Sequence, residues 1–206
     1  MIRNLVLVSM TALALAACQP PAEAPVAPAE PTVPTTPTAP TPTPVDTNAV
    51  TAEGWGPLRI GMTLAEITSA VGPDSQPNAV GGNDPAACDQ FRPERAPQGM
   101  LLMVEQGVLT RISLGRDNAL KTDRGLGLGD TAAAVKAAYG AAATASPHKY
   151  QSAPAEYVTV WSGAAPAAGA PAPATARGIV YEIGSEGTVM AIHAGGPSIQ
   201  YVEGCS

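Results

Sequence analysis

The residues best suited to metal binding or acid–base chemistry are two histidines, His148 and His193, the only imidazoles in the chain. They lie far apart in the sequence and form no H-x-x-x-H pair. A zinc site would therefore need the fold to bring them together with a carboxylate, for which Glu156 and Glu203 are candidates. The plainer interpretation is that each histidine makes ordinary hydrogen bonds. We predict no metal and no cofactor.

Two further motifs match catalytic patterns only in part. Ser146 and Lys149 form an S-x-x-K, but the S-D-N and K-T-G partners of serine acyl-transferases are missing. The glycine-rich run 125–130 lacks the Lys-Ser/Thr of a phosphate-binding loop. No nucleophile–base pair is evident, so we predict that the protein is not an enzyme. The net charge of −6 argues against a nucleic-acid partner.

The three cysteines divide into one lipid site and one pair. Arg3 and the apolar run 5–16 are typical of a signal peptide, which we place at residues 1–17. Leu15-Ala16-Ala17-Cys18 resembles the lipobox of bacterial lipoproteins, which implies that Cys18 carries palmitate-type acyl chains; a plain signal peptide is the alternative. Cys88 and Cys205 remain, an even pair for an oxidising compartment, and we predict a disulfide between them rather than two free thiols.

Residues 18–51 are predicted to be a disordered tether behind the lipid anchor. Proline, threonine and alanine dominate, and Lys and Arg are missing from the segment. Such a sequence cannot bury enough apolar surface to fold and favours extended polyproline II. Some 30 residues would span on the order of 90 Å. Residues 52–206 are then left as the globular domain.

The elements that must position these residues occur in two copies. Leu58–Gly72 predicts a short extended segment, a turn at a glycine, a helix capped by Thr63 with Glu66, and a helix end at Gly72. Leu126–Gly140 repeats this pattern with Thr131 as the cap and no capping box. In each copy two apolar runs around a glycine turn then predict a β-hairpin, at 100–112 and 179–192. We predict two repeats, at about 52–120 and 121–206, with the Ala/Pro/Gly run 163–176 as an inserted loop.

This repeated unit resembles two families: the small outer-membrane lipoproteins of the β-barrel assembly machinery (SmpA/OmlA type) and the tandem-repeat β-lactamase inhibitor proteins. The resemblance covers Leu58–Ile112 and Leu126–Ile192 and transfers no functional residue. It implies an α+β fold in which helix plus antiparallel strands repeat in tandem, forming one continuous sheet or two joined sheets covered by helices.

The surface loops offer the best candidate contacts. His148 and Tyr150 lie in one loop, and His193 and Tyr201 flank a Gly-Gly-Pro turn near the C-terminus, where residues 199–202 are long enough for one more strand. We therefore expect a non-catalytic envelope lipoprotein, anchored by lipid in the outer membrane and facing the periplasm, whose domain binds another envelope protein as an assembly or scaffold factor. An inhibitor of a periplasmic or cell-wall enzyme, and a small-ligand or metal-binding protein or enzyme using the His148 and His193 loops, are the alternatives.

Overall fold

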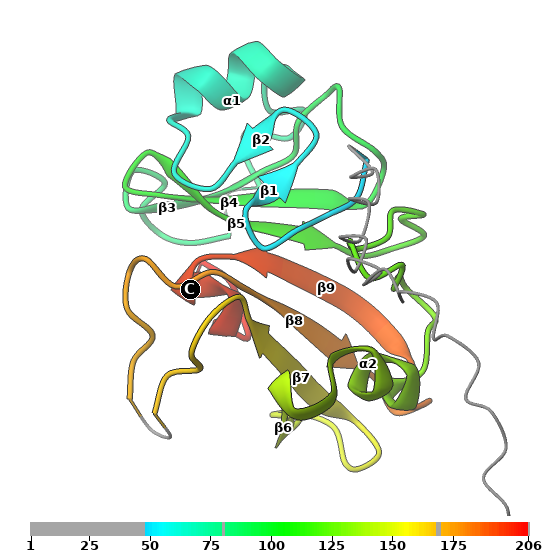
Figure 1. The fold of residues 1–206 in the computed structure, drawn as a ribbon. Coiled ribbons are helices and arrows are strands. Elements are labelled where there is room, and N and C mark those ends of the chain that lie inside the picture. The colour runs from blue at the N-terminus through cyan, green and yellow to red at the C-terminus, as the bar shows by residue number, and fades with distance from the viewer. Residues whose placement is uncertain (1–47, 80, 168–169, 206) are drawn as a thin grey trace, which may run out of the picture. The chain divides into compact units, whose positions relative to one another are not determined.

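The dominant feature is an antiparallel sheet of seven strands, in the order β3-β4-β5-β9-β8-β7-β6 (Figure 1). The computed structural model describes residues 48–79, 81–167 and 170–205. The strands are β3 (Cys88–Phe91), β4 (Met100–Glu105), β5 (Val108–Leu114), β6 (Ala143–Pro147), β7 (Glu156–Trp161), β8 (Gly178–Ile183) and β9 (Val189–Gly195). A two-stranded sheet, β1 (Gly54–Trp55) and β2 (Leu58–Arg59), accompanies it. The fold is mixed but mostly β.

Two short helices begin and end where the sequence predicts. In α1 (Leu64–Val71), the Thr63 side chain accepts the Glu66 N–H, and the Glu66 carboxylate accepts the Thr63 N–H. This capping box satisfies backbone donors that the first helical turn leaves free. In α2 (Ala132–Tyr139), Thr131 caps alone. Glycines end both helices, Gly72 with φ 86° and Gly140 with φ 54°.

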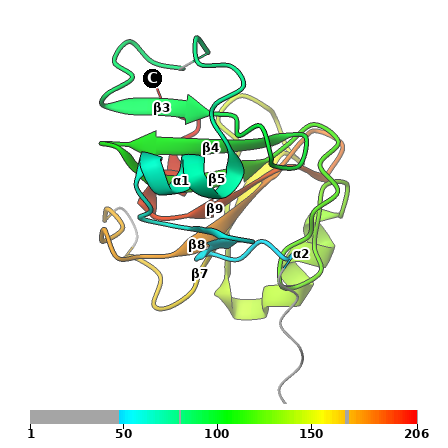
Figure 2. The same ribbon diagram turned by 90° about the horizontal axis from the view of Figure 1, so that it is seen from above.

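Both helices lie against one face of the large sheet. Ile67 and Val71 of α1 and Val135 of α2 belong to the same hydrophobic core as Ile112 and Tyr181 of the sheet. α1 packs on β5, whereas α2 packs on β6 and β7 (Figures 1 and 2). Since successive strand residues point to opposite faces, the other face receives the alternate, more polar side chains.

The two halves of the chain contain matching backbone hydrogen bonds. Gly61 N donates to Leu109 O at 2.7 Å, and Gly129 N donates to Val189 O at 2.9 Å. The first residue of each helix likewise donates to the glycine of its own hairpin turn: Leu64 N to Gly107 O, and Ala132 N to Gly187 O. Strands β5 and β9, one from each half, pair at the centre of the sheet.

Several expectations need correction. Residues 199–202 do not extend the sheet; η2 (Pro197–Gln200) is a 3-10 helix, because proline at its first position favours a helical turn. The helical cover is limited to two eight-residue helices. Val50, assigned to the tether, is fully buried, and its N–H donates to Lys121 O at 2.9 Å.

The signal peptide at 1–17, Cys18 and most of the tether lie outside the described residues. Within the described ranges, no helix combines the length and apolar character needed to cross a membrane.

Candidate functional site

The C-terminal segment, residues 196–205, lies on the face of the large sheet opposite the helices. Its η2 turn contacts β5, β8 and β9. A disulfide between Cys88 of β3 and Cys205 fixes its end, as predicted. Arg111, buried in β5, fixes its middle: Nη1 donates to Ser198 O at 3.1 Å and to Tyr201 O at 2.8 Å. Burial lowers the pKa of Arg111, and the negative charges of Glu105 and Glu182 oppose that shift.

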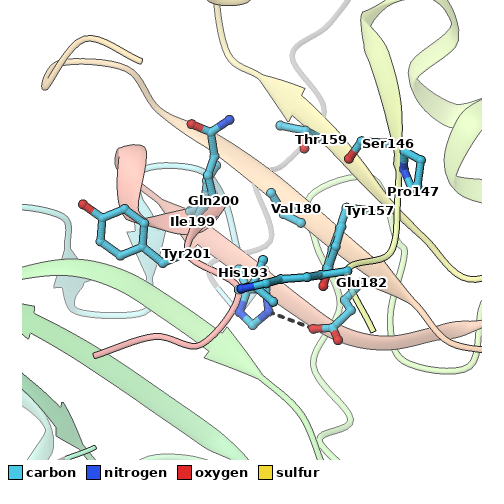
Figure 3. A pocket seen from close by; sticks show the side chains of 12 residues that line it. Ser146, Pro147, Tyr157, Thr159, Val180, Glu182, His193, Ile199, Gln200 and Tyr201 are labelled. Carbon is cyan, nitrogen blue, oxygen red and sulfur yellow. Dashed lines mark hydrogen bonds and ion pairs between the residues drawn. The ribbon is translucent and has the colours of Figure 1, made fainter. Parts of the chain in front are cut away.

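Beside this segment the sheet is hollowed into a cavity of about 270 Å³ (Figure 3). Strand residues Tyr157, Thr159 and Val180 line it from the sheet, while Ile199, Gln200 and Tyr201 line it from the C-terminal segment. Ser146, Pro147, Lys149, Glu182, His193 and Val202 complete the lining. The hollow therefore combines aromatic and aliphatic walls with a few polar groups.

At one end of the hollow, both histidines contact a single carboxylate, that of Glu182. His148 Nε2 lies 3.0 Å from Oε1, and His193 Nε2 lies 3.4 Å from Oε2. His148 is nearly fully buried, with its ring stacked on Tyr157 at a centroid distance of 4.7 Å. The side chain of His193 is 16% exposed. The fold thus brings together two residues that are far apart in the sequence.

The hydrogen-bond partners fix the protonation pattern of both rings. An ionised carboxylate only accepts hydrogen bonds, so each Nε2 carries the proton. His148 Nδ1 then accepts from the backbone N–H groups of Tyr150 and Gln151, at 3.1 and 3.2 Å. His193 Nδ1 accepts from the Ser113 hydroxyl at 2.9 Å. Glu182 is therefore linked to the 148–151 loop through His148 and to Ser113 of β5 through His193.

Ser113, His193 and Glu182 have the residue types of a hydrolase triad, but the surroundings of Ser113 do not favour acyl transfer. Ser113 is 8% exposed and lies within a central strand, paired with Leu101 on one side and His193 on the other. Acyl transfer needs backbone or side-chain donors aimed at the developing oxyanion, and in a central strand the backbone N–H groups are committed to pairing. The arrangement is suited to holding an ionised carboxylate in place at the end of the hollow.

The pKa shifts of Glu182 and His193 agree with a network that keeps the Glu182 carboxylate ionised. The hydrogen bond from His193 is the main cause that lowers the pKa of Glu182; burial opposes it and His148 adds to it. Burial lowers the pKa of His193, as does the nearby positive charge of Arg111, while Glu182 opposes both. At neutral pH the network therefore holds one negative charge and a neutral His193.

These shifts predict that the fold loses stability in acid. A group whose pKa is lower in the folded protein stabilises the fold above its unfolded pKa, and this contribution is lost as the pH falls through the folded pKa. For His193 the loss begins near pH 6.5 and for Glu182 near pH 4.5, their ordinary pKa values. We expect the melting temperature to fall steadily below pH 6.5.

His193→Gln should make this fall shallower between pH 6.5 and 4.5. Thermal melts at half-unit pH steps measure the effect, and Lys121→Gln, which replaces an exposed lysine outside this network, is the matched control. Parallel curves for H193Q and the wild type would show that His193 does not carry the pH dependence.

The predicted surface residues Tyr150 and Tyr201 come to the same side of the domain. Tyr150 is 62% exposed and Tyr201 48% exposed. The Tyr150 hydroxyl donates to Glu203, which also pairs with Lys149 Nζ at 3.1 Å. Glu203 therefore links the loop at 148–150 to the C-terminal segment.

Other candidates are placed differently from expectation. Glu156 pairs with Lys136 and Glu203 with Lys149, whereas the carboxylate that the histidines share is Glu182. His148 supports the loop from beneath and contributes little exposed surface. Within the part of the chain that the structure describes, no group of three or more His, Cys, Asp or Glu side chains is arranged to hold a metal ion.

Sequence reasoning overlooked Glu182 and Ser113. A charged residue inside the apolar run 179–183 is a detectable signal, because alternation places Glu182 on the face opposite Tyr181. Ser113 offers no such signal, since its contact with His193 depends on the pairing of β5 with β9.

Comparisons of the chain with protein-family models, with curated proteins and with solved structures found no match.

Proposed function

We propose that this chain is a non-catalytic, lipid-anchored protein of the bacterial cell envelope whose folded domain binds another protein through the sheet face opposite α1 and α2. The contact surface consists of the hollow, the exposed lining residues Gln200, Tyr201 and Val202, and exposed Tyr150, which follows the lining residue Lys149. We call these four exposed residues the rim. An assembly or scaffold role at the outer membrane, facing the periplasm, fits the resemblance to the barrel-assembly lipoproteins.

The observation that carries the binding proposal is the convergence of two distant loops at one hollow. Tyr150, Tyr201 and Val202 are three of the five large apolar residues that are most exposed in the described chain. Exposed apolar groups next to a cavity are typical of interaction sites, and tyrosines are frequent anchors in protein interfaces. The disulfide and Arg111 hold the C-terminal part of the rim in place before any partner arrives, which reduces the entropy lost on binding.

The size of the hollow favours a partner's side chain over a free ligand. Pockets for small molecules usually measure about 300–1,000 Å³, and this one measures about 270 Å³. One or two side chains would fill it. A basic or hydroxyl-bearing side chain could contact Glu182, whose charge the two histidines maintain.

The anchoring part of the proposal rests on sequence. Cys18 follows an apolar run directly, and the Pro/Thr/Ala tether would let the domain reach neighbours well away from the membrane. A domain tethered in this way would lie among other envelope proteins, which agrees with a function that depends on binding a partner through its surface.

We further propose that the domain is a tandem repeat, with units at about 52–120 and 121–206. The matching helix caps, hairpins and inter-element hydrogen bonds of the two halves support it. A repeat of this kind also underlies the alternative function, inhibition of a periplasmic or cell-wall enzyme, which would use the same face; the class of the captured partner separates the two.

Replacing both exposed tyrosines should test the binding surface. We expect Tyr150→Ala with Tyr201→Ala to reduce capture of the partner from cross-linked envelopes by at least roughly tenfold, since interface energy concentrates in such anchors. The melting temperature should stay within a few degrees because both side chains are exposed.

Leu64→Ala is the matched control, an exposed apolar residue of α1 that is 41% accessible. Equal capture by the tyrosine variant, the Leu64 variant and the wild type would rule out the rim as the binding surface.

A further inference from the structure

The two edges of the large sheet differ in how they are protected. At the β3 edge the preceding loop folds over the strand end: Ser75 N donates to Arg92 O, and Arg92 N donates to Asp74 Oδ1. Asp89 adds a charge there. The opposite edge is β6, Ala143–Pro147, in which four of five residues are exposed and none is charged (Figure 1). Proteins normally protect edge strands with charges, prolines, bulges or a covering segment. β6 carries no charged residue, and its one proline is the terminal Pro147.

The pairing of neighbouring strands shows which backbone groups of β6 face outward. Ser162 N donates to Arg177 O just beyond the β7–β8 ladder, so alternate β7 residues 156, 158 and 160 bond to β8. Tyr157 and Thr159 therefore bond to β6, through Ser146 and Thr144. The bond from His148 N to Ala155 O fits the same alternation. Hence Ala143, Ala145 and Pro147 direct their backbone groups away from β7.

These outward groups are mostly acceptors. All three residues have a carbonyl, but Pro147 has no N–H, and the Ala143 N–H donates to Gly140 O within the preceding turn. Only Ala145 offers both an N–H and a C=O. The edge therefore presents three acceptors and one donor.

We propose that β6 accepts an extended segment of the partner protein as an eighth, antiparallel strand. Its central residue would exchange two hydrogen bonds with Ala145, and the residues two positions before and after it would donate N–H groups to Pro147 O and Ala143 O. The segment must therefore carry no proline at these three alternate positions. This proposal deepens the function above and rests on it, because it names the kind of partner segment that the domain takes.

A second copy of the chain fits this edge poorly. In an antiparallel β6–β6 pair centred on Ala145, Pro147 of each copy would lie opposite Ala143 of the other. Neither residue can then donate, so only the two bonds at Ala145 would form. A heterologous strand forms four.

The added strand would also extend the face that carries the hollow. Ser146 lies opposite Tyr157 and Thr144 opposite Thr159, and Ser146, Tyr157 and Thr159 all line the hollow (Figure 3). Partner residues next to Ser146 and Thr144 would share that face. Because the intervening β6 side chains are small, a long partner side chain can reach across them toward the hollow.

Selection of a phage-displayed library of random nine-residue peptides on the immobilised full chain tests this proposal. The best-binding peptide is then methylated at one backbone nitrogen at a time. We expect methylation at three alternate positions to weaken binding roughly tenfold or more each, and methylation at the two positions between them to have much less effect. Ala145→Pro, which removes the outward N–H without touching the β7 ladder, should weaken binding similarly.

Three results would overturn the edge site: no peptide selected, no alternation in the methylation scan, or a dimer of the chain that Ala145→Pro abolishes. Peptides that are lost with Tyr150→Ala and Tyr201→Ala but bind the Ala145→Pro variant normally would contradict the edge site while supporting the proposed binding face. Because methylation changes only the peptide, its result does not depend on how Ala145→Pro folds.

Discussion

Replacing both Cys88 and Cys205 by serine is expected to lower the free energy of unfolding by about 4–5 kcal/mol. The two cysteines are 117 residues apart, and closing a loop of that length in the unfolded chain removes a large amount of conformational entropy. For a protein of this size the melting temperature should fall by roughly 10–20 °C. Thermal and urea denaturation of the oxidised wild type and of the double variant measure the difference.

Reduction of the wild-type protein by a thiol should reproduce the melting temperature of the double variant. The variant should also capture less partner, because residues 199–202 form one wall of the hollow and the end of their segment would no longer be joined to β3. A melting temperature unchanged within a few degrees, with or without reduction, would show that the disulfide adds nothing to the stability of the fold.

Cys18→Ala is expected to abolish attachment through lipid, so that the protein is either released from the membrane or stalled as its unprocessed precursor. Each CH₂ group buried in the bilayer contributes about 0.8 kcal/mol, so several acyl chains on Cys18 would make the anchor stable, whereas the tether and the acidic domain offer no alternative attachment. Wild-type protein should incorporate labelled fatty acid and partition into detergent. The variant should carry no label and should appear in the soluble fraction or remain as unprocessed precursor.

Cys205→Ala provides the control for loss of a cysteine as such, since Cys205 is joined to Cys88 in the folded domain. Wild-type protein that stays soluble and unlabelled would contradict lipid anchoring and, with it, the proposed location in the envelope.

The features that the sequence predicts well are those determined locally. The capping box of Thr63 and Glu66 depends on residues three apart, and the glycines at 72 and 140 end helices through their own backbone conformation. The hairpins at 100–114 and 178–195 follow from apolar runs around short glycine turns. The disulfide follows from the number of cysteines: with Cys18 assigned to lipid attachment, only Cys88 and Cys205 remain to pair.

Several features that escaped prediction depend on pairing between distant segments, although β7, rich in aromatic and β-branched residues, has the local pattern of a strand. β6 is Ala-Thr-Ala-Ser-Pro, whose small residues give no clear hydrophobic alternation, and it is a strand only because β7 pairs with it. The contact of Glu182 with two histidines requires the registers of β8 with β9 and of the 148–151 loop with β8. No local sequence pattern encodes these registers. The sequence therefore does not predict the hollow, although it indicates several of the residues that line it.

The segment at 197–202 shows how two local signals compete. Ile199 and Val202 suggest a strand, but Pro197 at the start of the run favours a helical turn, and Arg111 then captures two carbonyls of that turn. The result is a ridge beside the hollow in place of another strand.

A photoreactive amino acid at Gln200, in the full chain expressed in its own envelope, tests the central claim most directly. Gln200 is exposed and lines the hollow, whereas Ala137, an exposed residue of α2, serves as the control position on the helical side. We predict that Gln200 cross-links to one protein in high yield, that Ala137 does not, and that Tyr150→Ala with Tyr201→Ala removes the cross-link. Equal cross-linking from both positions, or cross-linking from Ala137 alone, would contradict binding through the sheet face opposite α1 and α2.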